Sequence, residues 1–353
     1  MINTTFCKSL LIFLMAGAIQ TTTAQKAPRQ EINDYINQVN PNAPVRKTSS
    51  NIIIAGTGMT LRAFEPYGGD RNEGRYADAV NRYQEILGSS VQVYCMIIPT
   101  AVAFYCPDGA KEWTRDERRA INYIHSRLSD NVKVVDAFTT LGKHASEPIY
   151  SRTDHHWAPL GAFYAAREFA KMAKVSFPTL DAYDTKVVRN YVGSMARFSH
   201  DPAVRRAPES FVYYVPKDSS YTTTMTVYTL DKGRKNVIGA SEPHDAKFFR
   251  TYKDGSSAAY CTFMGGDDRN VQVRTNTPNS RRLLILKDSY GNALPSYLFS
   301  SFEEIHVADC RYFTPNVIDY VRNHHITDVL FANNLIHASM PKTSNSYMNY
   351  LEQ

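Results

Sequence analysis

The chain has 353 residues, 43% of them hydrophobic and 21% charged, which is the composition of a globular protein. Its formal net charge is +6 at pH 7, but the basic residues are scattered, with short clusters only at Arg205-Arg206 and Arg281-Arg282. A nucleic-acid-binding protein needs a denser basic stripe, so we expect no nucleic acid as a partner.

Residues 1–25 have the layout of a secretory signal peptide. Lys8 is their only charge, and it precedes the apolar run 10–19 and the small-residue site Thr22-Thr23-Ala24. The apolar run is too short to span a membrane, and no later stretch is long and apolar enough. We therefore expect an exported protein, periplasmic or extracellular, with no transmembrane segment in the mature chain. Residues 26–50 are polar and contain three prolines, and they predict a lead-in segment.

From residue 51 onward, short apolar runs alternate with helix-like patterns. One helical stripe ends at Gly88, and Thr114 with Glu117 predicts a capping box for the next helix. Pro159 suits the first turn of a third helix. Strands are predicted at 51–56, 91–98, 132–135, 283–286, 304–308 and 329–332, and helical stripes at 76–87, 121–128, 159–174, 291–299 and after Thr314-Pro315.

Strands that alternate with helices predict an α/β fold, a mainly parallel sheet with helices on both faces. Residues 200–278 differ, because β-branched and aromatic stretches such as SFVYYV and TTTMTVYTL are separated by Gly, Asp and Pro turns. They predict an inserted β-rich subdomain. The α/β domain would then comprise residues 51–199 and 279–353, interrupted by the insert.

Four cysteines follow the signal peptide: Cys95, Cys106, Cys261 and Cys310. Their spacing matches no metal signature. An exported protein can form disulfides, so Cys95 and Cys106 could pair across a turn. Buried free thiols are the alternative.

Two polar groups of residues fall at predicted strand ends, where α/β sheets bind ligands. The first is SRTDHHWAP, residues 151–159. Its Asp154-His155-His156 suits either metal ligation or acid–base work, but zinc needs further ligands and no second cluster has such spacing, so we expect no metal. The alternative is a helix cap, Thr153 or Asp154, with partly exposed histidines.

The second group is KDSYGN, residues 287–292, between a strand and a helix-like pattern. Ser289 there suits an N-cap, but a serine between strand and helix is also how hydrolases expose a nucleophile. A nucleophilic serine needs a general base and a group that orients the base. Asp154 and His156 can supply both if the two loops meet.

TDHHW followed by PLGAFYAAREFA, with the later LLILKDSYGNAL, closely resembles the DHHW family of exported bacterial proteins. The stretches FMGGDDRNVQVRT (263–275) and VADCRYF (307–313) also look like the DHHW pattern, so the resemblance covers about residues 50–335. This family is in turn similar to the SGNH-hydrolase-like periplasmic O-acetyltransferases, including the alginate acetylation proteins.

The resemblance implies an SGNH-like three-layer α/β/α domain in which the catalytic Asp and His precede the Ser. Carried over residue by residue, Asp154 orients, His156 is the base and Ser289 is the nucleophile. Lys287 stands where SGNH enzymes have the glycine of Gly-Asp-Ser. The Ser289 N–H is the natural first oxyanion donor, and Asn292 and Asn334 are candidates for the second.

These features predict acyl-ester chemistry on a polysaccharide or acetylated glycan, by an esterase or an O-acetyltransferase whose acyl donor the sequence does not specify. No nucleotide or metal motif is present, so we expect no cofactor. The alternative is a catalytically silent glycan-binding or scaffold protein of the cell envelope, whose tyrosines and β-rich insert offer a sugar-binding face.

Five further residues are candidates for the substrate cleft: His155, Trp157, Tyr290, Arg311 and Tyr312. Trp157 could instead be a packing residue that fixes the motif loop. Arg311 could meet an anionic sugar or form a surface ion pair. His324-His325, between a helix and a strand, is predicted to be solvated.

Overall fold

A computed structural model describes residues 40–68 and 72–352 of the chain. The predicted signal peptide and residues 26–39 of the predicted lead-in segment lie outside these ranges. Within them, no helix is both long enough and apolar enough to cross a membrane.

Nine strands form the main sheet: β4 (Gln92–Ile98), β5 (Lys133–Val134), β8 (Thr222–Leu230), β9 (Val237–Ala240), β10 (His244–Asp245), β11 (Arg269–Arg274), β12 (Arg282–Lys287), β13 (Glu304–Asp309) and β14 (Asp328–Asn334). Their order is β10-β8-β11-β13-β12-β14-β4-β5, with β9 beside β8. The five strands from β13 to β5 are parallel, and β11, β8 and β10 continue the sheet antiparallel. The mainly parallel core confirms the predicted α/β class.

Two smaller antiparallel sheets flank the main one. The first contains β1 (Val45–Lys47), β2 (Ile53–Ala55) and β3 (Arg62–Phe64), and the second contains β6 (Tyr183–Tyr191) and β7 (Glu209–Pro216). The strand predicted at 51–56 therefore exists as β2, but it pairs with β1 and β3 and not with the parallel strands.

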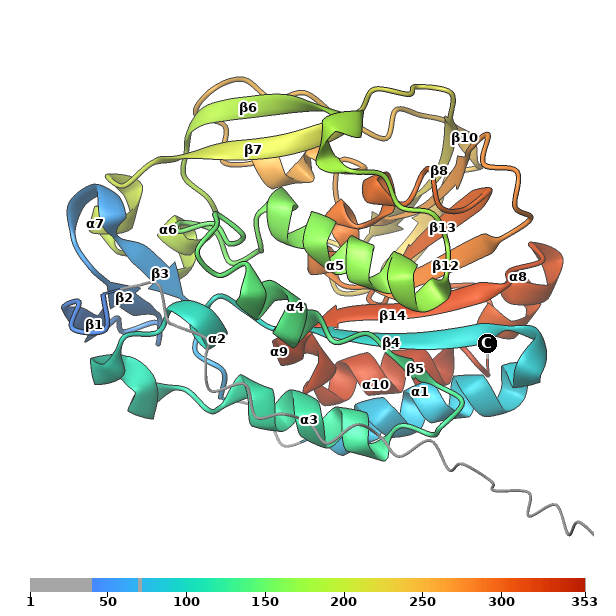
Figure 1. The fold of residues 1–353 in the computed structure, drawn as a ribbon, viewed down its shortest axis with the longest axis horizontal. Helices are drawn as coiled ribbons and strands as arrows, with labels where there is room; N and C mark the ends of the chain where they lie inside the picture. Colours follow the sequence, from blue (N-terminus) through green and yellow to red (C-terminus); the bar gives the residue numbers. More distant parts are fainter. Residues whose placement is uncertain (1–39, 69–71, 353) are drawn as a thin grey trace, which may run out of the picture. The chain divides into compact units, whose positions relative to one another are not determined.

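Helices cover both faces of the main sheet. The α-helices are α1 (Glu73–Leu87), α2 (Val102–Tyr105), α3 (Glu117–Arg127), α4 (Ala137–Lys143), α5 (Pro159–Ala173), α6 (Met195–Phe198), α7 (Pro202–Arg205), α8 (Val317–Asn323), α9 (Leu335–Ala338) and α10 (Pro341–Asn349). In Figure 1, α5 lies on one side of β14 and β4, and α1 and α10 lie on the other. Neighbouring strand residues point to opposite faces, and accordingly Tyr94 of β4 packs on Phe169 of α5, while Phe331 of β14 packs on Tyr83 of α1. The result is a three-layer α/β/α arrangement.

The sequence signals for α1 are confirmed. Its apolar stripe is buried, and the helix ends at Gly88, whose φ of +63° favours glycine.

The helix predicted over 291–299 is wrong. That stretch forms two short 3-10 turns, η6 (Ser289–Ala293) and η7 (Pro295–Tyr297). Pro295 has no N–H to donate and its ring would clash with an α-helical carbonyl four residues earlier, so an α-helix cannot run through it.

The β-rich stretch contributes strands to two sheets. β8 and β11 extend the main sheet, while β7 pairs with β6, which precedes residue 200. The division of the chain at residues 200 and 278 stays a prediction. The four cysteines in the described part of the chain form no disulfide, and Cys95, Cys106 and Cys310 are buried.

The predicted capping box at α3 is wrong. Asp116 caps the helix by accepting a hydrogen bond from the Arg119 N–H at 3.1 Å. Glu117 is buried instead, and its carboxyl group accepts from the N–H and the hydroxyl of Thr100 at 2.8 and 2.5 Å. Burial raises the pKa of Glu117 to about 7, although the Thr100 hydrogen bonds oppose the shift.

This buried carboxyl predicts a pH-dependent stability. Between pH 4.5 and 7 the folded protein keeps a proton on Glu117 that the unfolded chain has lost, so the free energy of unfolding falls as pH rises through this window. We expect a loss of about 3 kcal/mol, measured by urea unfolding at pH 5 and pH 8. Glu117→Gln should remove this part of the pH dependence, whereas the exposed control Glu112→Gln should leave it.

Candidate active site

The two predicted polar loops meet at the carboxyl edge of the parallel strands. Ser289 lies two residues after the end of β12, and Asp154 and His156 lie in the loop that leads into α5. That loop is closed at its base by a bridge between Tyr150 and Trp157. The Ser289 hydroxyl oxygen lies 2.9 Å from Nε2 of His156, and Nδ1 of His156 lies 2.6 Å from Oδ1 of Asp154. Ser289 is half-buried.

Asp154 is buried and fully hydrogen-bonded. Its Oδ1 also accepts from the His156 N–H at 3.0 Å, and its Oδ2 accepts from the Ser194 N–H at 2.7 Å. Gly193 lies so close that a Cβ there would collide with the Asp154 carboxylate. Burial alone would raise the pKa of Asp154, but the charge and hydrogen bond of His156 outweigh it and hold this pKa well below its usual range. Asp154 is therefore a carboxylate at neutral pH.

The imidazole of His156 is sandwiched between two rings. Tyr260 stacks on it with ring centroids 3.8 Å apart and planes 7° apart, and His155 lies 3.7 Å away on a tilted plane. The Tyr260 hydroxyl donates to the Tyr290 carbonyl at 2.8 Å. Tyr260, which sequence reasoning missed, thus fixes the ring plane of His156.

Loss of this stack should lower turnover. An aromatic face stabilises an adjacent cation, so Tyr260 favours the imidazolium that forms when His156 takes a proton. We expect Tyr260→Leu to lower kcat for an acetyl ester about tenfold with little change in KM. Tyr260→Phe keeps the ring and should retain most activity. A similar loss in Tyr260→Phe would assign the effect to the hydroxyl and its hydrogen bond to Tyr290, and a change in KM alone would contradict a role of the ring in turnover.

The predicted cleft residues near the loop 151–157 mostly make hydrogen bonds that hold this loop in place. Trp157 is buried and donates its indole N–H to the Tyr290 carbonyl at 2.9 Å, which agrees with the packing alternative. Tyr290 is also buried, and its hydroxyl donates to the His155 carbonyl. His155 is half-buried, with Nδ1 2.5 Å from the Ser194 hydroxyl, and burial followed by the nearby His156 lowers its pKa to about 3.

The two asparagines predicted as oxyanion donors both donate hydrogen bonds to aspartates. The Asn292 side-chain N–H donates to Asp267 at 2.7 Å, and the Asn334 backbone N–H donates to Asp288 at 2.8 Å, while its side chain caps α9. Asp288 itself caps η6 through the Tyr290 N–H at 2.8 Å. No described residue accepts a hydrogen bond from the Ser289 N–H, so that donor is free. The role of Asn292 and Asn334 stays a prediction.

Behind Ser289 lies a network of four charged side chains. Asp309 is fully buried, 2.8 Å from Lys287 Nζ, and two Arg311 nitrogens approach it at 2.7 Å. Arg311 also pairs with Asp267 at 3.1 Å, and its guanidinium lies 5.3 Å from the ring of the half-buried Tyr312. Arg311 is thus committed to an internal ion-pair network. Sequence reasoning missed Asp267 and Asp309, although the stretches FMGGDDRNVQVRT and VADCRYF that contain them looked like the DHHW pattern.

A further acid faces the site. Glu65, after β3, is half-buried, and burial raises its pKa, while the nearby charges of His337 and His156 oppose that shift.

Asp154, His155 and His156 also have ligand atoms within 4.8 Å of one another. Their hydrogen bonds to each other and to Ser194 already occupy those atoms, which fits acid–base work better than metal ligation.

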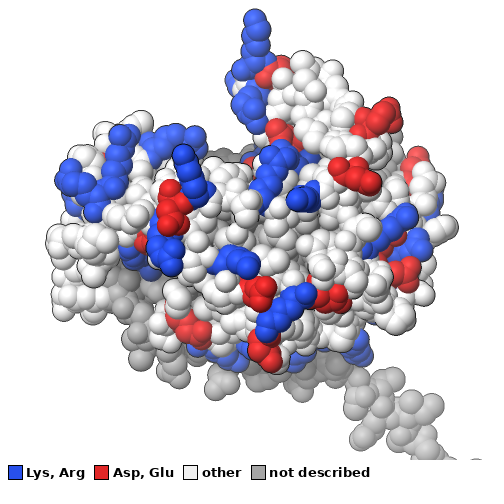
Figure 2. All heavy atoms as spheres, turned by 90° about the horizontal axis from the view of Figure 1, so that it is seen from above, with Lys and Arg blue, Asp and Glu red and all other residues white. Residues whose placement is uncertain are grey.

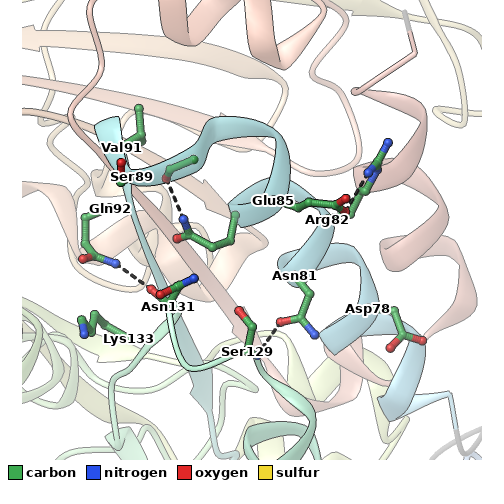
Figure 3. Close-up of a pocket in the computed structure, with 12 residues that line it drawn as sticks. Asp78, Asn81, Arg82, Glu85, Ser89, Val91, Gln92, Ser129, Asn131 and Lys133 are labelled. Atoms are coloured by element: carbon green, nitrogen blue, oxygen red, sulfur yellow. Dashed lines mark hydrogen bonds and ion pairs between the residues drawn. The ribbon is translucent and has the colours of Figure 1, made fainter.

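Two surface features lie outside this site. A hollow of about 720 Å³ opens beside the C-terminal end of α1 and the first residues of β4 and β5, the sheet edge opposite to Ser289. Figure 3 shows that its polar side chains largely bind the protein itself, as Asn81 does with the Ser129 N–H. Figure 2 shows one face of the molecule, where Lys and Arg are interspersed with Asp and Glu over much of the surface.

The sheet order, the helices on both faces and the two loops at the carboxyl edge are those of an SGNH-hydrolase-like fold. A family model described as "DHHW protein" matches residues 51–308, and the chain belongs to this family. It is 36% identical to a DHHW family protein from Eubacterium siraeum, with a TM-score of 0.77, over 86% of this chain and 97% of that one.

Two structures of PatB1 from Bacillus cereus are also similar in fold. The structure with a sulfonyl adduct is 20% identical, with a TM-score of 0.63, over 85% of this chain and 98% of that one. The other structure of PatB1 is 21% identical, with a TM-score of 0.62, over 83% of this chain and 99% of that one. No curated protein matches the chain.

Proposed function

We propose that this protein is an exported serine O-acetyltransferase or esterase that acts on the O-acetyl groups of a polysaccharide. The observation that carries the proposal is the chain of contacts from Ser289 Oγ to His156 Nε2 at 2.9 Å and from His156 Nδ1 to Asp154 at 2.6 Å. A serine hydroxyl becomes nucleophilic when a base oriented by a carboxylate accepts its proton.

Each step uses groups within reach of one another. Ser289 Oγ attacks the ester carbonyl carbon while His156 Nε2 takes the hydroxyl proton, and Asp154 stabilises the imidazolium. The tetrahedral intermediate collapses, the C–O bond to the leaving alcohol breaks, and His156 protonates that alcohol. Water or a sugar hydroxyl then attacks the acyl-enzyme with His156 again as base, which releases acetate or an acetylated sugar and restores Ser289.

The oxyanion of the intermediate needs donors that are already in place. The free N–H of Ser289 is one. Asn292 is the nearer candidate for the second in sequence, but its side-chain N–H donates to Asp267 and would have to turn toward the carbonyl. Asn334 is the other candidate.

The resemblance of the Asp-x-His-Trp and Asp-Ser-Tyr motifs to those of periplasmic O-acetyltransferases favours transfer to a glycan hydroxyl over hydrolysis. The same resemblance and the signal-like residues 1–25 support an exported location, periplasmic or extracellular. Likeness of fold alone is a weak warrant for function, so the proposal depends on the chemistry of the three side chains.

Turnover of a chromogenic acetyl ester tests the proposal. We expect measurable release by the wild type and a fall of about 10⁴-fold or more in kcat for Ser289→Ala and for His156→Ala. Ser300→Ala, an exposed serine of the same segment, is the matched control and should retain activity.

An added oligosaccharide distinguishes the two reactions. Acetylated oligosaccharide detected by mass spectrometry identifies a transferase, and acetate alone identifies an esterase. Equal turnover in the wild type and Ser289→Ala contradicts the proposed nucleophile. No turnover of any acetyl ester, together with binding of oligosaccharide, favours the catalytically silent glycan-binding alternative.

A further inference from the structure

The face of the sheet beneath α8 is polar although it is largely buried. In the pairing of β11 with β13, Gln272 lies opposite His306 and Arg274 lies opposite Glu304. The alternate residues of the same strands form an apolar layer on the other face, made of Val271, Val273, Ile305 and Val307. His306 is 0% exposed and Glu304 5%. Burying such groups is costly unless they are well partnered, so this layer calls for an explanation.

Three potential metal ligands converge in this layer. Glu304 Oε1 lies 2.8 Å from Nε2 of His306. His324, at the C-terminal end of α8, brings its ring to a centroid distance of 4.7 Å from that of His306. One ligand atom from each of the three residues lies within 4.8 Å of the other two. The prediction that His324-His325 is solvated holds for His325, which is exposed, whereas His324 is half-buried and its ring lies beside that of His306.

The second nitrogen of His306 is held in the way that metal-binding histidines are held. Its Nδ1 lies 2.7 Å from the Tyr320 hydroxyl, which also accepts from the Asn270 side chain at 3.2 Å. A ligating histidine usually bonds an outer partner through its other ring nitrogen, which fixes the ring orientation. Nε2 is then the nitrogen that faces the centre of the cluster.

A cavity of about 240 Å³ adjoins the cluster and is lined by His324, Tyr320, Gln272 and Asn270. Asn270 Oδ1 is buried and has no hydrogen-bond partner among the described residues. The cavity offers access for an ion and room for a water ligand. Glu304 Oε2 lies on the other side, 3.5 Å from Arg274 Nε, and Oε1 also accepts a hydrogen bond from the Gln272 side chain, which a bound ion would have to displace.

We propose that Glu304, His306 and His324 bind one Zn²⁺-type divalent ion, with water from the cavity at the fourth position. Two imidazoles and a carboxylate are a ligand set that zinc accepts, whereas calcium and magnesium prefer oxygen ligands alone. Binding of the ion replaces the hydrogen bond between Glu304 Oε1 and His306 Nε2. The proton shared in that hydrogen bond is released to solvent. The ion ties α8 to β13.

The site is separate from the proposed active site. Glu304 begins β13, while Asp309, the residue that packs against Lys287 behind Ser289, ends it. Five residues of extended strand span about 16 Å. The ion is therefore structural, and its presence does not depend on the proposed acyl-ester chemistry.

Metal titration of the tag-free, chelator-treated protein tests this inference. We expect calorimetry to show one equivalent of Zn²⁺ bound, Co²⁺ to give the visible absorption of a four-coordinate site, and Tm to rise by a few degrees with either ion. Mg²⁺ should have no effect. Tyr320→Phe should weaken Zn²⁺ binding about tenfold, because it removes the outer partner of His306.

Two variants at the ligands and two controls make the outcome specific. His324→Ala and Glu304→Gln should abolish stoichiometric binding while their Tm without metal shows that they fold. His325→Asn, in which asparagine suits the positive φ of this position, should bind like the wild type. Asp154→Asn should also bind like the wild type. Absence of saturable Zn²⁺ binding, unchanged binding in His324→Ala, or loss of binding in Asp154→Asn alone would overturn the proposal.

Discussion

Asp154→Asn should lower kcat for an acetyl ester by about 10⁴-fold while the protein stays folded. The carboxylate accepts from His156 Nδ1 and so sets the tautomer in which Nε2 can take the Ser289 proton. An asparagine of the same shape can still accept from the Ser194 N–H at one atom, but its amide N–H₂ cannot accept from Nδ1. Ser289 and His156 then stay in place, but His156 has the wrong tautomer to accept the Ser289 proton.

The measurement is steady-state turnover, together with a thermal melt for each variant. Asp319→Asn, an exposed aspartate on α8, is the matched control and should leave kcat unchanged. Because the pKa of Asp154 lies well below its usual range, protonation of this residue should not limit turnover above about pH 4. An Asp154→Asn variant with wild-type kcat would remove Asp154 from the mechanism.

Asp309→Asn should cost about 3 to 5 kcal/mol of unfolding free energy, because it strands a buried charge. The side chain of Lys287 is 2% exposed and that of Asp309 is 0% exposed, with Arg311 as the second cation. The pKa of Asp309 is lowered because these two cations outweigh the effect of burial, so the carboxylate is charged in the fold.

Urea unfolding at neutral pH gives the free energy. The Asp319–Arg322 pair is exposed on both sides, so Asp319→Asn should change stability by less than about 1 kcal/mol. The double variant Lys287→Met with Asp309→Leu removes both charges and should recover much of the loss. Equal effects of Asp309→Asn and Asp319→Asn would show that the buried pair is not stabilising. This pair also gives a structural reason for lysine at the position where SGNH enzymes have glycine.

The alternation of strands and helices was predictable because it depends on local signals. The buried stripe of α1 and the glycine at its end, or Pro159 at the start of α5, are features of a few adjacent residues. The prediction failed where one residue overrode the pattern. Pro295 divides the stretch after Ser289 into two 3-10 turns. Glu117 accepts hydrogen bonds from the buried Thr100 instead of capping α3.

Part of the candidate site was predictable for a different reason. Ser289 follows a parallel strand, so its place at the carboxyl edge of the sheet was predictable. The strand end predicted before Asp154 and His156 is wrong, because Tyr150 forms only an isolated antiparallel bridge with Trp157, and the expected meeting with Ser289 depended on the family resemblance. Tyr260 and Ser194 were missed because no local pattern links them to His156 and Asp154. Their contacts depend on how segments distant in the sequence pack, and the same holds for the contact of His324, at the end of α8, with His306.

Covalent labelling of the full mature chain with an aryl sulfonyl fluoride tests the central claim, that Ser289 is a nucleophile activated by His156. Intact-mass and peptide-mass measurements should find one adduct, on Ser289, in the wild type and in the Ser300→Ala control. We expect no adduct in Ser289→Ala and slow labelling in His156→Ala. An adduct that forms at the same rate in Ser289→Ala, or on a different residue of the wild type, would contradict the account.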